Sequence, residues 1–137
     1  MTAKTEINQL NEQGQKTGIW EDYYSDGKLA NTGEYLNGEK TGIWKLYLRN
    51  GVLRTTGNYI NGKMNGPWLW NRESGVLWQT GDFHNDIKVG LWKRYHPNGE
   101  LYDQGEYDEQ GERIGLWETY GTDGKLTRKK TFRASTK

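Results

Sequence analysis

The sequence predicts an all-β fold, a single elongated and twisted antiparallel β-meander built of two-strand repeats of about 24 residues. Three observations predict it. The pattern Gly-x-Trp returns at intervals of 24, 24, 24 and 25 residues. Asn-Gly and Asp-Gly dipeptides recur within these intervals, and they favour tight β-hairpins. No segment has the 3.6-residue period of a helix, and glycine recurs too often for one to form.

The repeat is defined by the distance of its residues from each Trp. When the Trp is position 0, glycine stands at +7, Leu at +9, glycine again at +13 and an aromatic residue at +15. These scaffold residues are Trp20, Trp44, Trp68, Trp92 and Trp117, then Leu29, Leu53, Leu77, Leu101 and Leu126, and at +15 Tyr35, Tyr59, Phe83, Tyr107 and Phe132. Such self-similarity is the signature of a repeat architecture.

The repeats divide a single domain of residues 1–137 into one partial and five whole units. The partial unit covers residues 7–17, the whole units cover 18–41, 42–65, 66–89, 90–114 and 115–133, and a basic C-terminal tail covers 125–137. The extra residue before Gly115 falls in a turn, where insertions are tolerated.

Two-residue type I′ turns are expected at +6/+7 and at +17/+18 of each unit. In the register that they impose, Trp20 faces Gly33 across the first turn, and Asn31 faces Trp44 across the second. Because side chains alternate along a strand, both turns then put Trp, Leu and the +15 aromatic on one face. The glycines leave bare backbone over which a large ring can lie.

A basic residue stands four positions before four of the five Trp residues. The second turn pairs Lys40 with Tyr35, so we expect a cation–π contact with the +15 ring of the adjacent strand. Met64 is the exception in the third unit.

Composition places the core in aromatic side chains. Only 32% of residues are hydrophobic and the mean hydropathy is −1.08, but 7 Trp, 9 Tyr and 2 Phe supply apolar area in large units. Cysteine is absent, which excludes disulfides and thiolate metal sites. The N-terminus has no apolar signal-like region and no run is long enough to span a membrane, so we expect a cytoplasmic protein.

No catalytic constellation stands out. The two histidines, His84 and His96, do not repeat, and most carboxylates are turn-formers or alternate along strands. No nucleophile elbow or phosphate-binding loop is present. We therefore expect no enzyme activity, no metal and no cofactor.

Binding residues are sought where the units differ. The candidates for partner binding are Trp70, Arg72, Trp78, Arg94 and Tyr102. Trp78 has an alternative interpretation, cross-strand packing against Asn71 on the second face of the sheet. Trp70 has no such pairing and is expected on the Trp68 side, where clustered aromatics and Arg are typical of an interface hot spot.

The segment "GIWKLYLRNGVLRTTGNYINGKMNG" resembles the MORN-variant repeat, and the likeness covers roughly residues 10–132. The pattern departs from it at Asn71, Asp86 and Lys130. Bacterial proteins made only of such repeats are similar to antitoxin or immunity components, the YwqK-like family. The resemblance implies a curved β-meander that binds a partner protein, and it assigns no catalytic residues.

The leading hypothesis is a non-catalytic antitoxin or immunity-type module that neutralises a partner toxin by steric occlusion. Residues 1–124 hold 13 Lys and Arg against 18 Asp and Glu, which suits steering of a basic toxin. No nucleic-acid partner is expected. Two alternatives stay open, a membrane- or phosphoinositide-associated scaffold acting through the basic tail and a cell-wall glycan-binding aromatic repeat. The sequence leaves the oligomeric state open.

Overall fold

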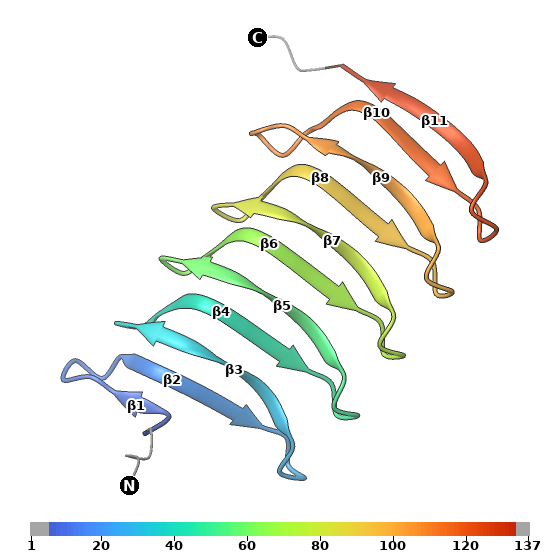
Figure 1. Cartoon of the computed structure of the whole chain (residues 1–137). Helices are drawn as coiled ribbons and strands as arrows, with labels where there is room; N and C mark the ends of the chain where they lie inside the picture. The colour runs from blue at the N-terminus through green and yellow to red at the C-terminus, as the bar shows by residue number, and fades with distance from the viewer. Residues whose placement is uncertain (1–5, 134–137) are drawn as a thin grey trace, which may run out of the picture.

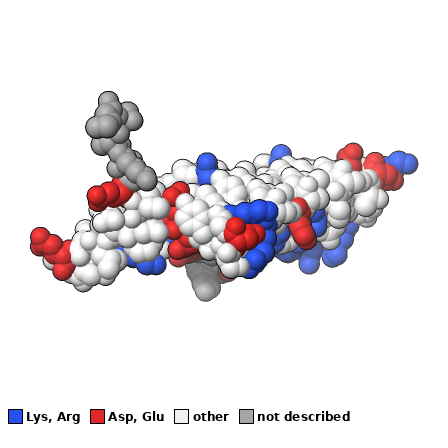
Figure 2. Space-filling view, turned by 90° about the horizontal axis from the view of Figure 1, so that it is seen from below, with Lys and Arg blue, Asp and Glu red and all other residues white. Residues whose placement is uncertain are grey.

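The computed structural model describes residues 6–133 and confirms the predicted fold (Figure 1). Eleven antiparallel strands form one open sheet in which spatial order equals sequence order. The strands are β1 (Gln9–Leu10), β2 (Lys16–Tyr23), β3 (Leu29–Leu36), β4 (Glu39–Tyr47), β5 (Leu53–Ile60), β6 (Lys63–Asn71), β7 (Leu77–His84), β8 (Ile87–Tyr95), β9 (Leu101–Tyr107), β10 (Arg113–Tyr120) and β11 (Leu126–Phe132). Seen along the sheet in Figure 2, the molecule is a thin slab.

The basic C-terminal segment is a strand in large part. Residues 126–132 form β11, paired with β10 along its length. The last four residues of the predicted tail, 134–137, lie outside the described residues.

The first turn of each unit differs from the predicted two-residue type I′ turn. Gly27 N–H donates to Tyr24 O at 2.9 Å, and Tyr24 N–H donates to Lys28 O at 2.8 Å. Only Gly27, at φ 87°, is left-handed in this loop, so a three-residue loop ends in a glycine bulge. The Asp26 side chain supports it by accepting from Lys28 N–H at 3.0 Å.

The longer loop shifts the register near the turn by one residue. Tyr23 therefore pairs with Leu29, and Ala30 is the bulged residue. The same shift pairs Asn71 with Leu77, so the predicted pairing of Asn71 with Trp78 is wrong.

The second turn is of the predicted kind. Asn37 and Gly38 have φ of 49° and 85°, so both central residues are left-handed, and Tyr35 pairs with Lys40 as expected. The turn between β9 and β10 instead has the longer form, since Asp108 N–H donates to Glu112 O at 2.8 Å.

A bulge at the Gly-x-Trp of β4, β6, β8 and β10 overturns the register predicted across the second turn. Between β3 and β4, Glu34 pairs with Thr41, and the next pair is Thr32 with Lys45. Gly33 thus faces three residues, and Asn31 pairs with Leu46 rather than with Trp44. The glycine two before each Trp makes the bulge possible because it adopts a left-handed φ, as at Gly18, Gly42, Gly66, Gly90 and Gly115.

The bulge turns each Trp ring back over the preceding strand. The ring of Trp44 covers Gly33 so closely that a Cβ there would lie 2.1 Å from it. Its indole N–H donates to Glu34 O at 3.0 Å. Trp20 does pair with Gly33, but the ring that covers this glycine belongs to the next unit. The same cover joins Gly57 to Trp68, Gly81 to Trp92 and Gly105 to Trp117.

These rings form a one-sided core along the whole sheet. Each Trp alternates with a +15 aromatic in edge-to-face contact, from Trp20–Tyr35 at 5.9 Å to Trp117–Phe132 at 6.2 Å between centroids. Each such pair adds about 0.5–1.5 kcal/mol beyond its buried area. Burial is deepest in the middle, where Trp68 and Trp92 are 4% and 3% exposed.

The two ends of the array are built differently from its interior. At the first end, the Asn8 side chain donates to Glu21 O and accepts from Glu21 N–H, at 2.9 and 2.7 Å. The amide thereby replaces the strand backbone that would otherwise pair there. At the other end, Lys130 pairs with Trp117, the place that glycine takes in the units before it. No further Trp follows to cover that position within the described residues.

Candidate partner-binding face

The face that carries the rings consists of two parallel rows of side chains. The fixed row contains the Trp residues and the +15 aromatics. The variable row contains the +2 and +11 residues, which pair from strand to strand in one unbroken line: Asp22, Asn31, Leu46, Thr55, Trp70, Gln79, Arg94, Asp103, Thr119 and Arg128. Members of both rows line the same recesses, so the rows share one face.

Trp70 lies in the variable row, on the Trp68 side as expected, and it is packed rather than free. Its ring is stacked on Trp68 at 6.0 Å between centroids and lies 5.8 Å from Trp92 and 6.0 Å from Phe83. Met64, which replaces the usual cation, packs against the same cluster. The third unit therefore has an apolar centre, of which half-buried Trp70 is a part.

The cations before the other Trp residues lie on the rings, but on different rings from those predicted. Lys40 Nζ is 4.8 Å from the Trp44 ring and 5.2 Å from the Tyr59 ring, both farther along the chain. The expected partner, Tyr35, is only its strand neighbour. The bulge is the reason, because it turns Trp44 toward Lys40. The pattern repeats at Lys16, Lys88 and Arg113.

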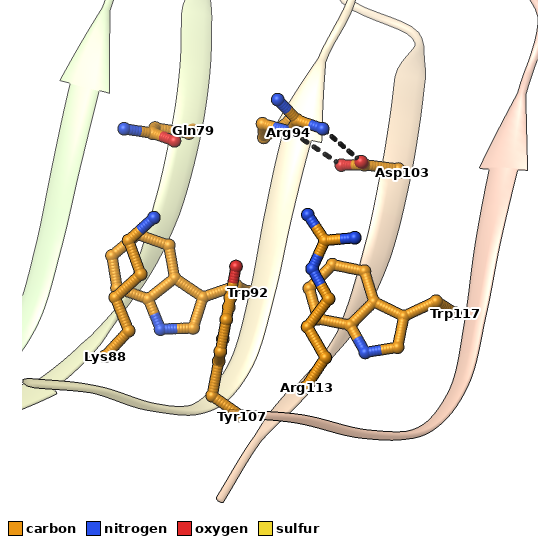
Figure 3. Close-up of a pocket in the computed structure, with 8 residues that line it drawn as sticks. All are labelled: Gln79, Lys88, Trp92, Arg94, Asp103, Tyr107, Arg113 and Trp117. Atoms are coloured by element: carbon orange, nitrogen blue, oxygen red, sulfur yellow. Dashed lines mark hydrogen bonds and ion pairs between the residues drawn. The ribbon is translucent and has the colours of Figure 1, made fainter. Parts of the chain in front are cut away.

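The C-terminal half of this face contains a charged recess (Figure 3). It has a volume of about 120 Å³. Its lining consists of Gln79, Lys88, Trp92, Arg94, Asp103, Tyr107, Arg113 and Trp117. The ends of Tyr107 and Arg113 point toward the pair formed by Arg94 and Asp103, and the end of Lys88 points toward Gln79.

Arg94 and Asp103 form the one ion pair among residues 6–133. Arg94 Nε donates to Asp103 Oδ1 at 3.0 Å and Nη2 to Oδ2 at 2.6 Å, a bidentate geometry. The hydrogen bond from Arg94 to Asp103 raises the pKa of the Arg94 guanidinium above its ordinary value. Asp103 is 7% exposed and the Arg94 side chain 43%, so the pair is buried at Asp103 and accessible to solvent at Arg94.

The remaining candidates lie nearer the first turns. Trp78 lies beneath Arg54 and Arg72, at 5.4 and 5.9 Å. Tyr102 lies beneath Arg94 at 5.1 Å and beside His96 at 4.9 Å. Only Trp70 and Arg94 thus belong to the variable row.

A set of ties between units, which the sequence did not reveal, accounts for Arg72. Its Nη2 donates to Tyr95 O at 2.9 Å. The residue at +4 makes the same tie through Tyr24 to Tyr47 O and through His96 to Tyr120 O, at 2.6 and 2.8 Å. In the second unit +4 is a leucine, and Arg54 on the next strand bonds Asn71 O instead, at 3.0 Å. Because different residue types make the equivalent bond in different units, the repeated residues of the sequence do not reveal it.

No three His, Cys, Asp or Glu side chains of residues 6–133 gather closely enough to hold a metal ion. Those residues include no helix with the length and apolarity that a membrane crossing requires.

The fold and the spacing of its Trp residues define an open β-meander of tandem repeats. Three segments, residues 16–37, 40–61 and 88–109, match the family model described as MORN repeat variant. These three segments, which together make up just under half of the chain, are therefore similar to MORN-type repeats. The third unit, with Met64 and Trp70, lies between the matched segments.

The other comparisons add little. Among solved structures the chain is similar to one titled "Crystal structure of GtfA/B complex bound to UDP and GlcNAc", at 15% identity and a TM-score of 0.38. The match covers 66% of this chain and 23% of that one, so this chain spans less than a quarter of that protein's length. No curated protein matches the sequence.

Proposed function

We propose that the protein is a non-catalytic binding module of the antitoxin or immunity type, which neutralises a partner toxin by covering its working surface. MORN-type repeats commonly act as modules that bind proteins or membranes, and of these two we propose a protein as the ligand. The carrying observation is the variable row: ten side chains in an unbroken line on one face of a rigid repeat scaffold.

The arrangement suits recognition because scaffold and contact residues are separated. The rings of the fixed row are buried or partly buried and hold the sheet, whereas the variable row changes in size, polarity and charge from unit to unit. Specific interfaces concentrate binding energy in a few aromatic and Arg side chains. Trp70, Arg94 and Arg128 are the members of the row with that character, and 43% of the Arg94 side chain is exposed.

The test is capture of a partner from the source cells with tagged protein, followed by expression of that partner alone and with this chain. We expect one stoichiometric protein whose expression arrests growth, and growth restored by co-expression. The matched variants are Arg94→Gln in the variable row and Lys93→Gln beside it, which removes the same charge from the neighbouring position. Recovery of no stoichiometric protein, or of one whose toxicity this chain leaves unchanged, would refute the proposal.

The membrane alternative requires a changed experiment. Because residues 126–132 form β11, deleting the basic segment removes a strand rather than a free tail. Charge substitution at Lys129, which is exposed on that strand, is the cleaner test of liposome association.

A further inference from the structure

We propose that the C-terminal half of the ring-bearing face is a trench for an extended acidic segment of the partner protein, with carboxylates about three residues apart. The trench consists of Lys88, Arg94, Arg113, Arg128 and Lys130 around Asp103. The inference rests on the proposed function and deepens it, because it names the chemistry that the face recognises.

Charge is concentrated in this region against the balance of the chain. Two adjacent recesses, which share Asp103, Arg113 and Trp117, are lined by five cationic side chains and one carboxylate. That carboxylate pairs with Arg94, and no other ion pair occurs among residues 6–133. The other four cations therefore have no internal carboxylate, although the chain as a whole holds 18 acidic residues against 19 Lys and Arg. An acidic ligand would supply the missing partners.

Two of these cations are held in place before any ligand arrives. Lys88 Nζ lies 4.8 Å from the Trp92 ring and 5.6 Å from the Tyr107 ring. The Arg113 guanidinium lies 4.7 Å from the Trp117 ring and makes a second such contact. Side chains ordered in advance lose less entropy on binding, so the two cations are preorganised for an anion.

The repeat sets the spacing of the ligand. Lys88 is on β8 and Arg113 is at the equivalent position on β10, two strands away. Two strand spacings amount to about 10 Å, and an extended peptide rises about 3.3 Å per residue. A segment that crosses the strands thus brings a carboxylate to successive cations at every third residue.

The recess favours carboxylates in a peptide over nucleic acid or lipid. Arg94 already holds a carboxylate in bidentate fashion inside it, which shows that the group fits there. Single-stranded nucleic acids need exposed rings for their bases to stack on. The rings here, Trp92 and Trp117, are 3% and 9% exposed and lie under cations, so they offer neither stacking platforms nor side chains that could insert into a bilayer.

The N-terminal half of the same face lacks this character. The recess around Trp44 is lined by two cations and a carboxylate, Lys40, Lys45 and Asp22, together with Leu46. In the third unit Met64 stands at the position, four residues before the Trp, where the other units have a cation. The chain thus contains its own control region for the trench.

The experiment measures binding of a fluorescein-labelled peptide of about 15 residues with Glu at every third position and Ser and Gly between. The test variant is Lys88→Met with Arg113→Met, and the matched control is Lys16→Met with Lys40→Met. Met64 shows that methionine fits this position, and both variants lose two charges of the same kind. Circular dichroism and Trp fluorescence check that both are folded.

We expect the test variant to lose at least about tenfold in affinity and the control to change less than about twofold, with binding weakened by salt. A peptide with the same Glu residues clustered at one end should bind more weakly. Equal losses in both variants, equal affinity for both peptides, or trench-dependent binding of phosphatidylserine vesicles or an oligonucleotide without peptide binding would overturn the trench.

The two proposals fail separately. If the wild-type protein and the Lys88→Met/Arg113→Met variant capture the same partner equally well, the trench is refuted and the binding function stands. If the wild-type protein captures no partner, the binding function is refuted, and the peptide measurement still decides what the trench recognises.

Discussion

The fixed row and the variable row lie side by side on the same face of the same strands, yet they obey opposite rules. Trp92 and Gly81 repeat in type because the ring of one lies on the backbone of the other. Arg94, two residues from Trp92, and Gln79, two from Gly81, pair across the same strands but do not repeat. In this molecule, invariance between units marks contacts that hold the sheet, whereas the varying positions include side chains such as Arg94 that are exposed enough to contact something else.

Removing a ring from the fixed row should lower the free energy of unfolding more than removing a side chain from the variable row. Trp92→Ala leaves a cavity beside Phe83 and Tyr107 and removes the bond from the indole to Asp82 O. We expect a loss of about 3–5 kcal/mol in the free energy of unfolding, measured in urea. Trp70→Ala removes a half-buried ring from the variable row and should cost about half as much. Similar losses for the two variants would mean that Trp70 belongs to the scaffold.

Adding a single methyl group beneath a ring of the fixed row should have the next largest effect on stability. The Cβ of Gly81→Ala would lie 2.0 Å from the Trp92 ring, so the ring must move. We expect a loss of about 2–3 kcal/mol in urea unfolding. Gln79→Ala on the same strand, in the variable row, should stay within about 0.5 kcal/mol of the wild type. An unchanged stability of the Gly81 variant would contradict the account of why glycine repeats there.

The face that carries the rings could be predicted from the sequence, because one register error preserves it and the other, a one-residue shift, is confined to the residues next to the first turn. The Gly-x-Trp bulge moves Asn31 from Trp44 to Leu46, a slip of two residues, and a slip of two preserves the face. Trp70 was therefore placed on the correct side. The direction of each ring was not predictable, since it depends on the left-handed φ of Gly42, a choice that glycine leaves open.

The candidate site was predictable only in part. Looking for positions where units differ found Trp70 and Arg94, but it joined to them Arg72 and Trp78, which lie nearer the turn. Arg72 differs in residue type from its counterparts at +4 but makes the same kind of bond. It donates to Tyr95 O, as Tyr24 donates to Tyr47 O in the first unit. Asp103 was missed although the predicted register, which sets each Trp opposite the +13 glycine, already places it opposite Arg94.

The tie made by Arg72 should have a smaller effect than either row. Arg72→Met leaves Tyr95 O without this donor, so we expect a loss of about 1 kcal/mol in urea unfolding. The control is Arg49→Met, an exposed arginine that lies over Tyr24 at 4.8 Å, with a loss within about 0.5 kcal/mol. Partner capture should survive in both variants. Weakened capture by a fully stable Arg72 variant would restore Arg72 to the binding face.

The smallest expected effect tests burial in the fixed row through alkaline pH. Burial, followed by the charges of Asp86 and Tyr35, raises the pKa of Tyr59 above its ordinary value of 10.0. The folded protein therefore holds this proton more tightly than the unfolded chain, and the resulting stability is present in full below the unfolded pKa. It is lost as the pH rises through the folded pKa. Phe83 occupies the same position in the third unit, so Tyr59→Phe should fold normally and show a shallower loss of stability above pH 10.0 in urea unfolding. Identical alkaline slopes for the two proteins would mean that Tyr59 is as well solvated in the folded sheet as in the unfolded chain, and that the fixed row is less sealed from water than its contacts indicate.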